Sequence, residues 1–118
     1  MNIVLLKSKS DKVNITSQQN TIIKYTKSAG LSLDVTEIEN SERDMVLEER
    51  KEFKGFLRSL SHNDNLLIYD LWTFSDDVGE LNKILECLLK RSISVHLCFQ
   101  NTIIDENTPS LETLSILA

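Results

Sequence analysis

Short apolar runs alternate along this chain with longer segments in which apolar residues recur every three or four positions. The first run starts at Ile3 and is wholly apolar, as in a strand that is buried on both faces. A different run, in which Leu31, Leu33 and Val35 alternate with polar residues, has the period of a half-exposed strand. The strands expected from these patterns are residues 3–6, 31–36, 66–71 and 93–99.

Helical spacing fills the segments between these strands. Gly30 is a suitable stop for the first helix, and Lys90 and Arg91 suit the negative end of the third. Thr108 and Pro109 predict the cap and first position of a last, short helical segment. The helices expected are residues 15–29, about 41–61, the segment from just after 75 to 90, and 110–118. Their buried faces are expected to be Phe53, Phe56, Leu57 and Leu60 in the second helix, and Val78, Leu81, Ile84, Leu85 and Leu88 in the third.

The strand–helix order predicts an α/β fold. Short apolar strands joined by helices are typical of a parallel sheet that is covered on both sides. We therefore expect a single three-layer domain over residues 1–118, with a mostly parallel sheet of four strands or slightly more and helices on both faces.

Composition agrees with this expectation and indicates a soluble protein with a single domain. A chain of 118 residues with 41% hydrophobic and 26% charged residues is typical of one soluble globular domain. No apolar run is long enough to span a bilayer, and Lys7 comes too early for a signal peptide. Cys87 and Cys98 lack metal-ligand spacing, so we expect buried thiols in a cytoplasmic protein.

The net charge and the lack of ligand motifs argue against a DNA binder, a metalloprotein and a cofactor-dependent enzyme. The net charge of −5 disfavours a DNA binder, although the first thirty residues hold five lysines against Asp11 alone. Those lysines could form a local basic face or an ordinary solvated surface. His62 and His96 have no ligand spacing, and there is no glycine-rich phosphate loop, so we expect no cofactor, no metal and no small-molecule substrate.

Several motifs resemble, in order and spacing, the N-terminal catalytic domain of serine recombinases, the resolvases and invertases. The relevant residues are Gln18 early in the first helix, Arg50 and Phe53 in an Arg-x-x-Phe pattern, Asn63-Asp64 before a strand, and the segment 104–118. The resemblance implies a resolvase-like fold, DNA recombination chemistry and a terminal segment that starts the family's long dimerisation helix. It also implies a bacterial or mobile-element setting.

The family nucleophile is a serine just after the first strand, and the resemblance leaves two registers open here. Counting from the N-terminus places Ser10 at the nucleophile, with Ser8 in place of a usual arginine. Counting back from Gln18 places Lys9 there, with Lys7 in place of that arginine. The sequence alone does not decide between the two.

The resemblance also shows where family residues are replaced. Trp72, Thr73 and Asp76 stand where the family has an acid and two arginines that serve phosphate chemistry. Arg50 matches an arginine that contacts the scissile phosphate in the family. From its neighbours alone, however, Arg50 is expected to be an ion-pair partner on a helix surface, near Glu49 and Glu52. Trp72, the sole tryptophan, could be a binding anchor or a packing residue.

Three hypotheses follow from the sequence. The first is a recombinase-like domain that has lost strand cleavage and acts as a dimerisation or partner-binding module, with weak DNA binding at most. The second is a divergent active serine recombinase that uses Ser10 with Arg50 and nearby lysines. The third is an unrelated small α/β binding domain. Self-association is expected from the apolar residues Leu111, Leu114, Ile116 and Leu117 of the terminal segment.

Overall fold

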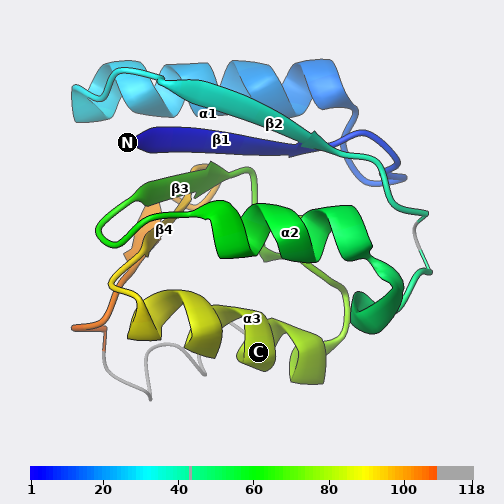
Figure 1. The fold of residues 1–118 in the computed structure, drawn as a ribbon. Coiled ribbons are helices and arrows are strands. Elements are labelled where there is room, and N and C mark those ends of the chain that lie inside the picture. The colour runs from blue at the N-terminus through cyan, green and yellow to red at the C-terminus, as the bar shows by residue number, and fades with distance from the viewer. Residues whose placement is uncertain (43, 109–118) are drawn as a thin grey trace.

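The computed structural model describes residues 1–42 and 44–108. These residues form a five-stranded sheet in the order β2-β1-β3-β4-β5, in which β5 alone is antiparallel to its neighbour (Figure 1). The elements are β1 (Asn2–Lys7), α1 (Ile15–Ala29), β2 (Val35–Glu39), the 3₁₀ helix η1 (Leu47–Glu49), α2 (Lys51–Ser59), β3 (Asn65–Ile68), the 3₁₀ helix η2 (Leu71–Thr73), α3 (Val78–Lys90), β4 (Ser94–Leu97) and β5 (Thr102–Ile104).

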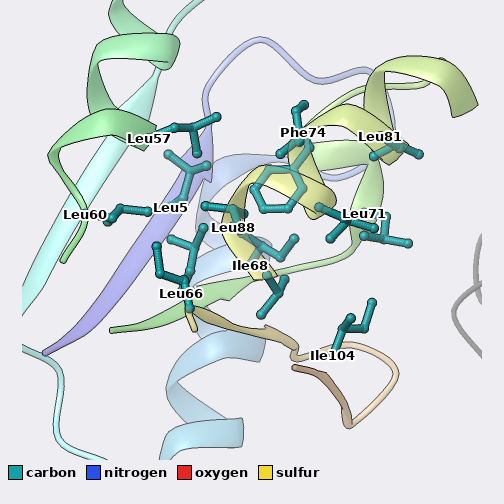
Figure 2. Close-up of a cluster of buried hydrophobic side chains, with 14 of the residues drawn as sticks. Leu5, Leu57, Leu60, Leu66, Ile68, Leu71, Phe74, Leu81, Leu88 and Ile104 are labelled. Carbon is teal, nitrogen blue, oxygen red and sulfur yellow. The ribbon is translucent and has the colours of Figure 1, made fainter. Parts of the chain in front are cut away.

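Helices cover both faces of the sheet, as expected. Figure 1 shows α1 on one side and α2 with α3 on the other. Under α1, the side chains of β1 alternate so that Val4 and Leu6 contact Ile22 and Tyr25. The opposite residues, Ile3 and Leu5, belong to a larger core beneath α2 and α3. Labelled members of that core in Figure 2 include Leu5, Leu57, Leu66, Ile68, Phe74, Leu81 and Leu88.

The first helix has the bounds that its sequence predicts. Asn14 caps its start, since the side-chain oxygen accepts a hydrogen bond from the backbone N–H of Ser17 at 2.9 Å. Gly30 ends it in the left-handed conformation, with φ of 70°, which a residue without Cβ adopts at little cost.

Several predicted boundaries are wrong, and the physical reasons differ. The second strand is Val35–Glu39 rather than 31–36, because the backbone of β1 pairs from Ile3↔Val35 to Lys7↔Glu39. It is an edge strand, which leaves Val35 and Ile38 exposed. The expected strands 66–71 and 93–99 shorten to β3 and β4, and β5 was not predicted, since three residues carry almost no periodic signal.

The predicted helix over residues 41–61 is also wrong. A non-helical segment and η1 precede α2, which starts only at Lys51. Two further expectations fail on α3: Val78 is exposed instead of buried, and the thiol of Cys87 is exposed while that of Cys98 is buried. The expected helix 110–118 and its apolar residues lie outside the described residues.

A buried hydrogen-bond chain joins α1 to the sheet. The hydroxyl of Tyr25 lies 2.6 Å from Nδ1 of His96, and Nε2 of His96 lies 3.1 Å from Oδ1 of Asn65. The Asn65 amide nitrogen donates onward to Asn2, so its oxygen accepts from His96. These contacts fit a neutral histidine with the proton on Nε2, in which Tyr25 donates to Nδ1. Burial lowers the pKa of His96, while the charge of Asp105 opposes that shift.

This histidine predicts a pH dependence of stability. Because the pKa of His96 is lowered on folding, the unfolded chain binds the proton better, and the free energy of unfolding should fall as pH drops through the ordinary value of 6.5. Each unit of that depression is worth about 1.4 kcal/mol. Urea denaturation at pH about 7.5 and about 5.5 measures the change.

The matched control is the other histidine of the chain. His96→Gln should flatten the pH dependence in this range, while His62→Gln, at an exposed position, should preserve it. Equal slopes in both variants would show that His96 does not carry the effect.

Candidate functional site

The topology of the sheet predicts a functional site at the edge where β1 and β3 end. From β1 the chain crosses to β2 through α1, and later it returns past β1 to β3 through α2. The two helices lie on opposite faces, so the crevice beyond the carboxyl ends of β1 and β3 is a topological switch point. The segments that reach it are the end of β1 with its following loop, and residues 69–77.

A buried charged cluster lies at this edge. Glu39 accepts hydrogen bonds from Nζ of Lys7 at 3.0 Å and from Nη2 of Arg50 at 3.2 Å. All three residues are less than 10% exposed. The guanidinium of Arg50 also donates to the backbone carbonyl of Phe74 and lies over the ring of Phe53, 4.0 Å from its centroid. The cluster thus ties β1, β2, α2 and η2 together.

The ionisation of Glu39 follows from these contacts. Burial alone would raise the pKa of its carboxyl group. Hydrogen bonds from Ser41 and Lys7, together with the charge of Arg50, outweigh burial and lower the pKa below its ordinary value of 4.5. Glu39 is therefore an anion that two buried cations compensate.

The expected surface role of Arg50 is wrong, because this side chain is only 3% exposed. Its partner Glu39 was not among the predicted site residues. The sequence signal for Glu39 is a carboxylate at the end of a strand, and the expected strand 31–36 stops before this residue, whereas β2 ends at it. Capture of Arg50 by Glu39 and Phe74 also explains why residue 50 is non-helical, with φ −84° and ψ 69°.

Gln18 fixes the end of β1 against α1. It is completely buried, and its side chain accepts a hydrogen bond from the backbone N–H of Lys7 at 3.0 Å. Its amide donates to the carbonyl oxygens of Lys7 at 3.0 Å and Val13 at 2.8 Å. Gln18 is thus a structural clamp that sets the direction of the loop after β1.

The candidate nucleophile positions lie in that loop. The hydroxyl of Ser10 accepts from the backbone N–H groups of Lys12 at 3.1 Å and Val13 at 3.4 Å. Lys9 forms an exposed ion pair with Glu42 at 2.5 Å, and Ser8 donates to Asn40. A cavity of about 460 Å³ adjoins the loop and is lined by Ser8, Lys9, Ser10, Asp11, Glu42 and Asp44.

The loop after β3 places Trp72, Thr73 and Asp76, which are expected to stand at family catalytic positions, in different environments. Thr73 is fully buried, and its hydroxyl has no hydrogen-bond partner among the described residues. Trp72 is half-buried and Asp76 is exposed. The ammonium group of Lys12 lies 2.6 Å from the Asp76 carboxylate and 5.8 Å from the centroid of the Trp72 ring.

A second cavity, of about 390 Å³, brings part of the predicted set together. Lys7, Arg50, Trp72 and Asp76 line it, whereas Ser10 lines the neighbouring cavity. Further carboxylates stand on its wall, those of Asp44, Asp77 and Glu80. The two lining cations pair with Glu39, and the four lining carboxylates outnumber them, so the lining has an excess of negative charge that repels a phosphate group.

Three of the five lysines in the N-terminal third form ion pairs with acids. Lys7, Lys9 and Lys12 pair with Glu39, Glu42 and Asp76, respectively. Within residues 1–42 and 44–108, no group of three His, Cys, Asp or Glu residues could hold a metal ion. In the same part of the chain, no helix is long and apolar enough to cross a membrane.

Comparison with known proteins identifies relatives of this fold. The family profile described as "Resolvase, N terminal domain" matches residues 7–118. Among solved structures, the N-terminal catalytic domain of TP901-1 integrase is similar over 98% of this chain and 88% of its own length, with a TM-score of 0.71 and 14% identity. A search of curated proteins finds no match.

Proposed function

Since the chain belongs to the resolvase N-terminal domain family, we propose that it is a recombinase-like domain that does not cleave DNA and serves instead as a dimerisation or partner-binding module. Phosphoryl transfer depends mostly on positioning and on cations that stabilise the charge of the transferring group. The availability of such cations therefore decides whether this site can act as an enzyme.

The state of Arg50 is the observation that carries the proposal. Its guanidinium is engaged by Glu39 and by the carbonyl of Phe74, and the side chain is 3% exposed. Nε of Arg50 has no partner among the described residues, but to bind a phosphate with both terminal nitrogens Arg50 would have to leave the buried carboxylate of Glu39, which would then remain paired with Lys7 alone. That exchange is costly because an incompletely compensated charge is left in the interior.

The loop after β3 supports the same conclusion. Thr73 lies fully buried at a position where the family resemblance implies an arginine, and it offers no charge. Asp76, in place of the second arginine, presents a carboxylate at the wall of the cavity. Loss of one such donor commonly lowers the rate by roughly a hundredfold or more. Loss of two arginines, one of which is replaced by a carboxylate, should leave very little DNA cleavage.

The alternative is an active enzyme that uses Ser10. One observation favours it: Ser10 and Lys9 both line the open cavity of about 460 Å³. The hydroxyl of Ser10 accepts two backbone hydrogen bonds and still has a proton to give.

A domain exchange tests the proposal. Residues 1–118 replace the catalytic domain of an active serine recombinase, whose own DNA-binding domain brings the chimera to its site on supercoiled DNA. We expect occupancy of the site by footprinting but no covalent protein–DNA adduct after denaturation. The unmodified recombinase is the positive control for adduct formation.

Two serine variants show which residue would form an adduct. An adduct that forms with the chimera, persists in Ser8→Ala and is lost in Ser10→Ala would establish the alternative and overturn the proposal. For the module itself, the first expected partner is a second copy, which would bind through Leu111, Leu114, Ile116 and Leu117.

A further inference from the structure

Three aromatic rings form a row along the carboxyl edge of the sheet. Phe99 follows β4, Tyr69 follows β3 and Trp72 lies in η2. The rings of Tyr69 and Phe99 are stacked, with centroids 4.9 Å apart and planes inclined by 20°, and the centroids of Tyr69 and Trp72 are 5.6 Å apart. Phe99 is 62% exposed, so one end of this aromatic row is open to solvent.

A cation already occupies the other end of the aromatic row. The ammonium group of Lys12 lies 5.8 Å from the Trp72 centroid and 2.6 Å from Oδ1 of Asp76. This distance is within the range in which a cation is attracted to a ring face. The chain therefore shows, with its own lysine, a cation seated between an aromatic face and a carboxylate.

Three carboxylates, those of Asp70, Asp76 and Asp77, lie near the Tyr69 and Trp72 end of the aromatic row and favour a cationic ligand. Asp70, which accepts a hydrogen bond from the amide of Gln100, lies between Tyr69 and Trp72 in the sequence. Asp76 and Asp77 line the cavity of about 390 Å³ that Trp72 also lines. Nucleic-acid bases could stack on these rings, but their phosphates would meet these acids and a chain of net charge −5.

We propose that the aromatic row and the adjoining cavity bind an arginine- or lysine-containing segment of a partner protein, and that Lys12 fills this place in the free domain. The proposal rests on the proposed function, since it names the partner chemistry of a module that does not hold DNA for cleavage. Arginine is especially suitable, because its planar guanidinium stacks on aromatic rings while its N–H groups donate to carboxylates.

The sole tryptophan makes the binding directly measurable. As the sole tryptophan of these 118 residues, Trp72 reports on its own surroundings by fluorescence. A short alternating arginine–glycine peptide should change that fluorescence saturably, and an alternating glutamate–glycine peptide and a DNA duplex should not. Phe99→Ser, at an exposed position, should weaken binding of the arginine peptide by about fivefold or more.

Removal of the internal competitor gives the sharpest test. Lys12→Ala should strengthen binding of the arginine peptide by about fivefold, whereas Lys24→Ala, which removes the same charge from an exposed position of α1, should have little effect. In the Lys12→Ala background, Asp76→Asn should then weaken binding by about tenfold, because the carboxylate no longer pairs with the peptide.

Besides absence of peptide binding, three results would overturn the inference: fluorescence changes with DNA in place of the arginine peptide, equal effects of Lys12→Ala and Lys24→Ala, or a Trp72 signal that depends on protein concentration alone. The last would show that a second copy covers the aromatic row. Since the chimera assay measures cleavage separately, absence of peptide binding together with absence of an adduct would refute this inference and leave the proposed function standing.

Discussion

Replacement of Glu39 by alanine should lower the free energy of unfolding by about 3 to 5 kcal/mol, because it leaves Lys7 and Arg50 in the interior without their carboxylate. Both cations are less than 10% exposed and share the same oxygen of Glu39. Arg50 would then keep the backbone carbonyl of Phe74 and the ring of Phe53 as its contacts, and neither of them carries a compensating charge. Urea denaturation of the purified chain measures the loss.

An exposed ion pair provides the matched control. Glu42→Ala breaks the pair with Lys9, both of whose side chains are well exposed, and should change the stability by less than about 1 kcal/mol. A similar small effect of Glu39→Ala would mean that water or a rearranged side chain reaches the cluster. It would also remove the main reason for regarding Arg50 as unavailable to a phosphate.

Low pH should also destabilise the cluster formed by Lys7, Glu39 and Arg50. The pKa of Glu39 is lowered on folding, so its stabilising contribution is present above the ordinary value of 4.5 and is lost as pH falls through the lowered one. Asp64 behaves in the same direction: burial would raise its pKa, but hydrogen bonds from Ser61 and the N-terminal amine lower it. The loss at acidic pH therefore comes from two buried carboxylates at opposite ends of the sheet.

The sequence predicts those parts of the fold whose signals are local. The bounds of α1 follow from helical spacing and from Gly30, and the buried face of α3 follows from Leu81, Ile84, Leu85 and Leu88. Buried strands such as β1 are visible because they are continuous apolar runs. The alternation of these two signals is sufficient to give the α/β class and helices on both faces.

Features that depend on distant partners are not predictable in this way. The start of α2 is set by Arg50, which leaves helical geometry to reach Glu39 and the carbonyl of Phe74. The position of β2 is set by its pairing with β1 rather than by its own alternation, and this error hid Glu39. The expectation for Val78 failed because the first turn of α3 extends beyond the core and leaves this side chain 52% exposed.

The same distinction between local and distant signals applies to the candidate site. The assignment of residues 72, 73 and 76 to family positions depends only on counting along one continuous loop and stays a prediction, while the loop itself lies at the switch point of the sheet. The charged cluster cannot be found by counting, because it joins residues from three separate segments. The loop that holds Lys9 and Ser10 is likewise set by Gln18, a distant residue whose three hydrogen bonds fix the end of β1.

Asp76→Arg should raise the affinity for duplex DNA by about tenfold at low salt, and the plot of log affinity against log salt should steepen by about one to two units. The substitution changes the local charge by two and also frees Lys12, which pairs with Asp76 at 2.6 Å. Asp76 is the suitable position for a single change, because it is exposed and an arginine there can stay in solvent. An arginine at Thr73 would instead have to enter a fully buried position. Fluorescence anisotropy of labelled DNA over a salt series provides the measurement.

Glu86→Arg is the control, since it makes the same change of charge at an exposed position of α3. Net charge alone would raise DNA affinity equally in the two variants. A larger and more salt-dependent gain for Asp76→Arg would locate phosphate contacts at the edge formed by Trp72, Asp76 and Lys12. Equal gains would mean that this edge does not lie along a DNA path, and the family's phosphate site would then have no counterpart in the loop after β3. In that case the carboxylates of the loop could not be the reason to expect weak DNA binding, and the proposal that the domain does not cleave DNA would rest on the buried state of Arg50 alone.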